Sequence, residues 1–160
     1  MNEKLKKYLE INLLLDAGWI DYNDASLDEY PSIRTSYKTI NTYIEDNKDG
    51  NIFQKLLFEY IDKKGLKDSD VYNKVNIDRR LFSKIRSDSN YHPSKETIIL
   101  LGLSLELNEE EIEKLLGSSS YFLPKNNYFD LIIRFCFIEG IYNLIDINEL
   151  LEEYGCKVLY

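Results

Sequence analysis

A short helix in the middle of the chain carries side chains that could read duplex DNA. From Asp78 to Arg86 the apolar residues recur at helical spacing, which turns Leu81, Phe82 and Ile85 to one side. The other side carries four polar residues: Arg79, Arg80, Ser83 and Lys84. Arginine on the first turn of a helix in the major groove can donate two hydrogen bonds to guanine O6 and N7. The pattern therefore predicts recognition of base edges.

Further cations flank this helix, and they are Lys74, Arg86 and Lys95. We expect these three to contact backbone phosphates, which position a protein on DNA without reading its sequence. In a competing interpretation, the cations are ordinary surface charges paired with neighbouring aspartates, namely Asp70, Asp78 and Asp88. The two interpretations differ in whether carboxylates share the basic face.

Other chemistry has little support in the sequence. His92 is the single histidine, and Cys136 and Cys156 are the only cysteines, so a multi-histidine metal site or a cysteine quartet is excluded. Asp21 and Asp24 lie in an acidic stretch without the glycine and the final glutamate of a calcium loop. No glycine-rich phosphate loop or nucleophile elbow occurs. We therefore expect no enzyme, no metal and no cofactor, and two free thiols in a reducing compartment.

Helical periodicity dominates the elements that must position these residues. Helices are expected over residues 3–15, 32–45, 53–61, 68–75, 78–86 and 128–138, with others starting at Ser94, at Asn108 and near Asp146. The predicted N-caps are Ser32, Asp68, Asp78, Ser94 and Asn108. Gly65 and Gly117 are expected to end helices. A polar run over 46–51 predicts a linker between an N-terminal helical appendage, residues 1–50, and a second unit, residues 51–160.

The charge distribution separates the centre of the chain from its flanks. The 160 residues carry a net charge of −8, yet residues 52–92 contain nine basic and six acidic side chains. The acidic flanks include a cluster of four glutamates, Glu109, Glu110, Glu111 and Glu113, which we expect to complement a helix dipole. This balance excludes a uniformly basic nucleic-acid coat. The apolar runs are too short for a signal sequence or a membrane span, so we expect a cytoplasmic protein that does not enter the membrane.

The central segment follows a recognisable order of helices and buried positions. Val71 and Val75 would be buried in one short helix, Ile77 would follow a tight turn, and Phe82 and Ile85 would anchor the next helix. Pro93-Ser94 and the aliphatic stretch 98–107 complete the pattern. Residues 66–107, or 52–107 with the first helix, thereby resemble the lambda-repressor-like (XRE) helix-turn-helix family. The resemblance implies an all-α helix-turn-helix bundle, and the tail resembles a C-terminal helical extension found in bacterial and phage proteins.

Two positions depart from the pattern of that family. Asn76 stands in the turn where the family usually has glycine, and asparagine tolerates the left-handed conformation that the turn needs. Tyr72 stands where the family usually has alanine. A tyrosine there either points outward or changes the angle between the helices expected over 68–75 and 78–86. The fit of the helix over 78–86 in a DNA groove depends on that angle.

Two functional hypotheses follow from these observations. In the first, the chain is a sequence-specific transcriptional regulator of bacterial or phage type that binds DNA as a homodimer. The segment from Phe129 to Ile138 is hydrophobic on more than one face, so it is either central in the bundle or half of a dimer interface, and we expect dimerisation through residues 128–144. In the second, an acidic inhibitor of phage or mobile-element origin, anti-CRISPR-like in action, reuses the fold to contact a protein partner.

Overall fold

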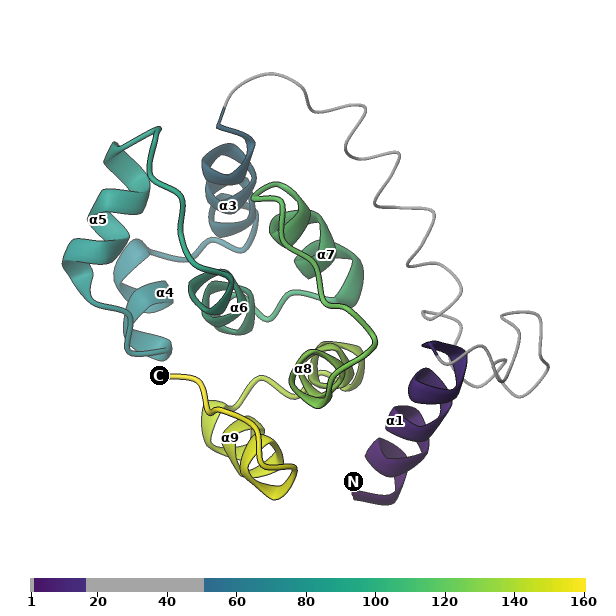
Figure 1. Ribbon diagram of the computed structural model, residues 1–160. Helices are drawn as coiled ribbons and strands as arrows, with labels where there is room; N and C mark the ends of the chain where they lie inside the picture. Colours follow the sequence, from purple (N-terminus) through teal and green to yellow (C-terminus); the bar gives the residue numbers. More distant parts are fainter. Residues whose placement is uncertain (1, 17–50) are drawn as a thin grey trace.

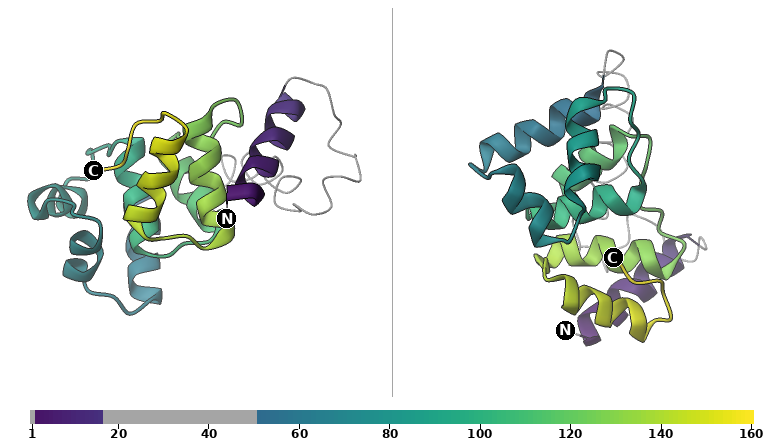
Figure 2. Two further views of the ribbon diagram at one scale, coloured as in Figure 1. Left: turned by 90° about the horizontal axis from the view of Figure 1, so that it is seen from below. Right: turned by 90° about the vertical axis from the view of Figure 1, so that its left-hand side faces the viewer.

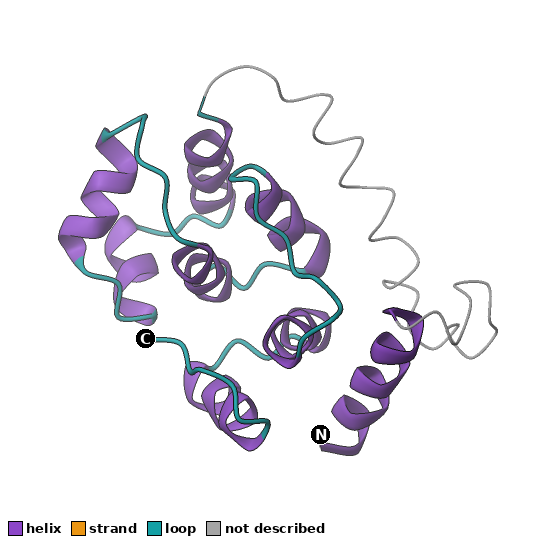
Figure 3. Cartoon of the chain, viewed as in Figure 1, coloured by secondary structure: helices purple, strands orange, loops and turns teal. Residues whose placement is uncertain are grey.

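All regular elements in the part of the chain that the structure describes are α-helices (Figures 1 and 3). The computed structural model describes residues 2–16 and 51–160. Its helices are α1 (Asn2–Asp16), α3 (Ile52–Lys63), α4 (Asp68–Lys74), α5 (Arg79–Ser87), α6 (Lys95–Ser104), α7 (Glu109–Gly117), α8 (Tyr128–Glu139) and α9 (Leu144–Glu153). The prediction of an all-α protein is confirmed. The expected helix over 32–45, the N-cap Ser32 and the pair Asp21 and Asp24 lie outside the described residues.

Side-chain caps fix the starts of three helices as the sequence predicts. Asp78 accepts a hydrogen bond from the Arg80 N–H at 2.7 Å, and Ser94 accepts one from the Thr97 N–H at 3.2 Å. Asn108 accepts from the Glu111 N–H at 2.9 Å. These bonds satisfy backbone donors that have no partner within the helix.

One predicted N-cap and one predicted helix start are wrong, although α4 begins at residue 68 as expected. Asp68 does not cap α4 but is its first residue, and the side chain of Asp70 accepts from the preceding Lys67 N–H at 3.2 Å. The last helix begins at Leu144 rather than near Asp146, because Asn143 accepts from the Ile145 N–H at 2.9 Å. In both places, a carboxylate or amide close to the helix start offers an alternative cap, and spacing alone does not choose between them.

α6 lies at the centre of the helices that follow Asn51 (Figure 1). All its residues from Ile98 to Ser104 are buried, and it packs against α4 and α7. Gly102 allows this close packing, because an added Cβ would overlap the side chain of Ile112 on α7 and press on Phe137 of α8. From Ile98 to Leu103 the helix is enclosed on all sides, and this part of its sequence is accordingly apolar without an amphipathic stripe.

α8 is the second enclosed helix, and its surroundings explain its apolar sequence. Residues 131–137 are all buried, and α8 packs against α1, α7 and α9 within one chain (Figure 2). From α1, Leu5, Tyr8 and Leu9 belong to the same hydrophobic core, and Lys4 forms a 2.6 Å ion pair with Glu139. Of the two interpretations of residues 129–138, the structure supports a central helix. The homodimer remains a prediction that draws no support from the apolar faces of α8.

Candidate nucleic-acid interface

A tight turn joins α4 to α5 and depends on a left-handed asparagine. Asn76 has φ of +56°, and the Ile77 N–H donates to the Tyr72 carbonyl at 2.9 Å. Asparagine adopts this conformation more easily than other residues with a Cβ. Ile77 follows directly and is buried. Asn76 therefore supplies the left-handed conformation that is predicted for this turn.

The apolar side of α4 and α5 is buried as the sequence predicts. Val71, Val75, Phe82 and Ile85 are each no more than 2% exposed. The hydroxyl of Ser104 on α6 donates to the Val71 carbonyl at 2.6 Å, which ties α4 to the central helix. The short helix α5 is thus held in a fixed orientation by its own buried residues.

Tyr72 lies between α4 and α5 and does not point wholly into solvent. Its side chain is half-buried, and its ring packs on Phe82 with ring centroids 5.5 Å apart. Phe58 of α3 packs on the other side of the same cluster, 6.2 Å from Phe82. Tyr72 also lines a shallow surface groove together with Arg79 and Ser83. The tyrosine therefore contributes to both the α4–α5 contact and the surface beside α5.

The outward side of α5 carries the predicted groove-facing residues. Arg79, Arg80, Ser83 and Lys84 are all exposed. Neither Arg79 nor Arg80 forms an ion pair with any residue that the structure describes. The Lys84 ammonium lies 4.7 Å from the centre of the Tyr91 ring, and it forms no ion pair with a described carboxylate. These three cations therefore form no ion pair with a described carboxylate, while Asp68, which lines the same groove as Arg79, is paired with Arg86.

The three flanking cations have a different environment. Lys74 pairs with Glu106, Arg86 with Asp68 and Lys95 with Asp130, each at 2.5 Å. The prediction that Asp70, Asp78 and Asp88 would be the partners is wrong, because these three carboxylates accept backbone N–H groups close to them in the sequence. Carboxylates from α4, from the turn between α6 and α7, and from α8 take their place. The hydrogen bond from Lys74 lowers the pKa of Glu106, and this carboxylate stays charged beside the lysine.

Lys95 is the flanking cation least suited to a phosphate contact. Its side chain is 26% exposed, and Asp130 is 6% exposed. Asp130 also accepts from the amide of Asn127 at 2.8 Å, so the pair joins α6 to the start of α8. Moving Lys95 to a phosphate would leave a buried carboxylate without its cation, which is costly.

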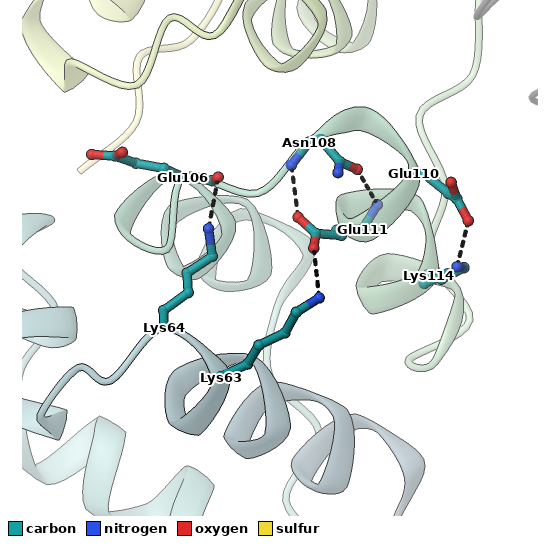
Figure 4. Close-up of polar contacts among 7 residues, drawn as sticks. All are labelled: Lys63, Lys64, Glu106, Asn108, Glu110, Glu111 and Lys114. Atoms are coloured by element: carbon teal, nitrogen blue, oxygen red, sulfur yellow. Dashed lines mark hydrogen bonds and ion pairs between the residues drawn. The ribbon is translucent and has the colours of Figure 1, made fainter.

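The acidic cluster at the start of α7 is satisfied within the fold (Figure 4). Lys114 donates to Glu110 at 2.5 Å and lowers the pKa of that glutamate. Glu111 accepts the Asn108 N–H at 3.0 Å, and Lys63 of α3 lies 3.9 Å away. Nearby, the Lys64 ammonium donates to the Glu106 carbonyl at 3.2 Å.

Arg134 on α8 accounts for the other two glutamates of the cluster. Its guanidinium is 3% exposed, donates to Glu109 at 2.9 Å and also donates to Glu113. A third hydrogen bond reaches the Leu123 carbonyl at 3.1 Å. Sequence reasoning missed this network. The available signals were the spacing of four between Glu109 and Glu113 and a single arginine within the otherwise apolar run 131–137.

Exposed carboxylates gather instead on the outer side of α9. The four are Asp146, Glu149, Glu152 and Glu153. They belong to the flank of the chain that carries most of the negative charge, and they are separate in sequence from α4 and α5. The basic and acidic surfaces therefore use different helices.

Comparison with family models, curated proteins and solved structures finds no match to this chain.

No described helix has the length and apolar character needed to cross a membrane. Within residues 2–16 and 51–160, no group of three or more histidine, cysteine, aspartate or glutamate side chains is arranged to hold a metal ion. Cys136 is buried and Cys156 half-buried, both as free thiols, and burial raises the pKa of Cys136 to about 12.

Proposed function

We propose that the protein binds duplex DNA sequence-specifically, with the outward side of α5 in the major groove. The observation that carries this proposal is the contrast between two sets of cations. Arg79 and Arg80, on the first turn of α5, are exposed and without carboxylate partners, whereas the flanking cations are paired. An exposed arginine on the first turn of a helix, with no ion pair to a described carboxylate, is available for a bidentate contact with guanine.

The fixed position of α5 supports the same function. Base readout requires that a short helix present its side chains at a defined depth and angle. Phe82 and Ile85 are buried, and Tyr72 and Phe58 pack around Phe82. These contacts hold the helix by its inner side and leave the outer side open.

The proposed contact set is narrower than the one drawn from the sequence. It consists of Arg79, Arg80, Ser83 and Lys84. To contact a phosphate, Lys74 would have to leave Glu106, and Arg86 would have to leave Asp68. Exchanging one anionic partner for another gives little net gain in electrostatic attraction. Because the net charge is −8, we expect weak binding to arbitrary DNA and a strong dependence on salt.

Selection from a library of random duplexes at low salt tests this proposal. We expect enrichment of one sequence, and a palindromic product would indicate that two copies bind together. Arg79→Ala or Arg80→Ala should weaken binding to that sequence by about 1–3 kcal/mol and relax its preference. Lys157→Ala is the matched control, because it also removes one positive charge from the surface. The Lys157 side chain is 66% exposed and is paired with Glu96. Failure to enrich any sequence would refute the proposal.

A second candidate function is inhibition of a protein partner by an acidic surface. The exposed carboxylates of α9 and the neighbouring Ile145, which is 69% exposed, favour it. The glutamates of α7 do not, because they pair with Lys114, Lys63 and Arg134. A specific partner protein that is captured by the parent protein and by Arg79→Ala, but not by Glu149→Lys, would support this function over DNA binding.

A further inference from the structure

A hollow of about 700 Å³ lies beside the start of α9, and we call it the α9 groove. From α9, Leu144, Ile145 and Asn148 line it. Lys74 at the end of α4 and Glu106 in the turn between α6 and α7 also line it. Hollows of about this size are typical of ligand-binding sites. The α9 groove therefore brings together segments that are far apart in the sequence.

Hydrogen bonds fix the walls of the α9 groove. The Tyr142 hydroxyl donates to the Leu107 carbonyl at 3.0 Å, which joins the loop before α9 to the turn between α6 and α7. The Asn148 amide donates to the Leu159 carbonyl at 3.0 Å and accepts the Leu159 N–H at 2.9 Å. The segment after α9 is thereby held against the helix. A site that is already formed loses little conformational entropy when a partner binds.

An exposed apolar side chain belongs to this groove. Ile145 lines it and is 69% exposed. Tyr142, Leu144 and Leu159 line the same hollow, so Ile145 is part of a shared apolar surface. A large apolar side chain of a partner in the groove would remove this surface from water, which is favourable.

Carboxylates continue the groove side of α9 beyond Ile145. Asp146, Glu149 and Glu152 are exposed, and none of them forms an ion pair with a described residue. Glu149 and Glu152 follow Ile145 by four and seven residues, so these three side chains share one face of the helix. At the rise of an α-helix, this face extends about 10 Å from Ile145 to Glu152.

This combination favours a basic protein segment over other partners. Lys74 and Glu106 pair with each other at 2.5 Å and add no net charge, whereas α9 adds only negative charge. Nucleic acid would be repelled by α9. A small molecule that fills the hollow would not reach Glu152. A second copy related by a twofold axis would bring the same carboxylates against each other.

We propose that the α9 groove binds a basic segment of another protein. A large apolar side chain of that segment inserts beside Ile145, and its lysine or arginine side chains contact Glu149 and Glu152. The apolar contact supplies most of the affinity, and the carboxylates orient the segment along α9. This inference goes beyond DNA binding by α5 and does not depend on it, because the two surfaces use different helices.

Selection of peptides from a random library against the full chain tests the proposal. We expect enriched peptides that combine a large apolar residue with lysine or arginine. Fluorescence anisotropy with the most enriched peptide then measures its affinity. Ile145→Ala should weaken binding about tenfold, and so should each of Glu149→Lys and Glu152→Lys. Phe122→Ala and Glu59→Lys are the matched controls, because both residues are exposed and neither lines the groove.

Charge exchange distinguishes a direct contact from a general electrostatic effect. Glu149→Lys should bind a peptide whose basic residues are replaced by glutamate better than the parent chain does. The inference is overturned if no peptide is enriched, if the enriched peptides lack basic residues, or if Ile145→Ala and Glu149→Lys both retain full affinity.

The remaining outcomes concern a second copy and DNA. Self-association of the parent chain in sedimentation that Ile145→Ala abolishes would assign the groove to a second copy and overturn the inference. Ile145→Ala should leave the affinity for the selected duplex unchanged, because Ile145 is not on α5. If no duplex is enriched, the proposed function fails, and the inference stands when the peptide results are as expected.

Discussion

The ring of Tyr72 on α4 packs against the ring of Phe82 on α5, with centroids 5.5 Å apart and ring planes inclined by 51°. This contact occupies the place where a small side chain is expected from the family resemblance. The aromatic pair fills the space between two short helices and extends to Phe58 of α3. Tilted aromatic pairs contribute stability beyond the burial of their area. The orientation of α5 therefore depends on aromatic packing rather than on close backbone approach.

Truncating the centre of this cluster should destabilise the whole fold. Phe82 is 2% exposed, and Phe82→Ala should lower the free energy of unfolding by about 3–5 kcal/mol, because a large buried ring is replaced by a cavity. Urea denaturation measures the change. Phe122→Ala, which truncates a phenylalanine that is 60% exposed, should stay within about 0.5 kcal/mol of the parent. Equal effects of the two substitutions would show that Phe82 is not a core residue.

The two arginines that form ion pairs within the described residues should differ in their importance for stability. Arg134→Met should cost about 3–5 kcal/mol, because it removes the buried guanidinium that donates hydrogen bonds to both Glu109 and Glu113. Arg86→Met removes an arginine whose side chain is 50% exposed and should cost about 1 kcal/mol or less. Thermal and urea unfolding of both variants check this order. A larger loss in Arg86→Met would contradict the assignment of Arg134 as the cation that holds α7 to α8.

Lys125 should make the stability depend on pH in the alkaline range. Burial, with a further contribution from the charge of Arg134, lowers its pKa to about 8, well below the ordinary value of 10.5. Below pH 8 the lysine is charged in both the folded and unfolded states, and the folded state bears the full cost of burying the charge. Between pH 8 and 10.5 the unfolded state binds more protons, so this cost is relieved as pH rises.

Comparison with Lys125→Met isolates this contribution from other groups that titrate at alkaline pH. The stability of the parent relative to the variant should increase by on the order of 2 kcal/mol from pH 7 to pH 10.5. Urea denaturation across this range provides the measurement. A constant difference between the two proteins would show that the Lys125 ammonium is not destabilised in the folded state.

Salt dependence of DNA binding should distinguish paired from unpaired cations. Arg79→Ala should reduce the slope of log affinity against log salt by up to about 0.9, because an unpaired cation that neutralises phosphate charge in the groove is lost. Lys74→Ala should change the slope little, since Glu106 already compensates its charge at 2.5 Å. Glu106→Gln should release Lys74 and steepen the slope. Equal reductions for Arg79→Ala and Lys74→Ala would place both side chains at the DNA and contradict the narrower contact set.

Local patterns in the sequence determine much of this protein. The helical periodicity around Phe82 and Ile85 already assigns the inner and outer sides of α5, because a helix of fixed pitch has only one arrangement of its apolar residues. The caps Asp78, Ser94 and Asn108 are local as well, since each bond spans only two or three residues. Whether α5 binds DNA remains a prediction.

Only the tertiary structure decided which charges remain available and which apolar helices are enclosed. Lys74, Lys95 and Arg134 find partners 32, 35 and 21–25 residues away in the sequence, and no local spacing specifies such pairs. Likewise, the sequence of α8 is compatible with a core helix or an interface, and packing by α1, α7 and α9 makes it a core helix. Side-chain ion pairs and the enclosure of a helix depend on contacts between distant segments, whereas periodicity and capping depend on the neighbouring turns alone.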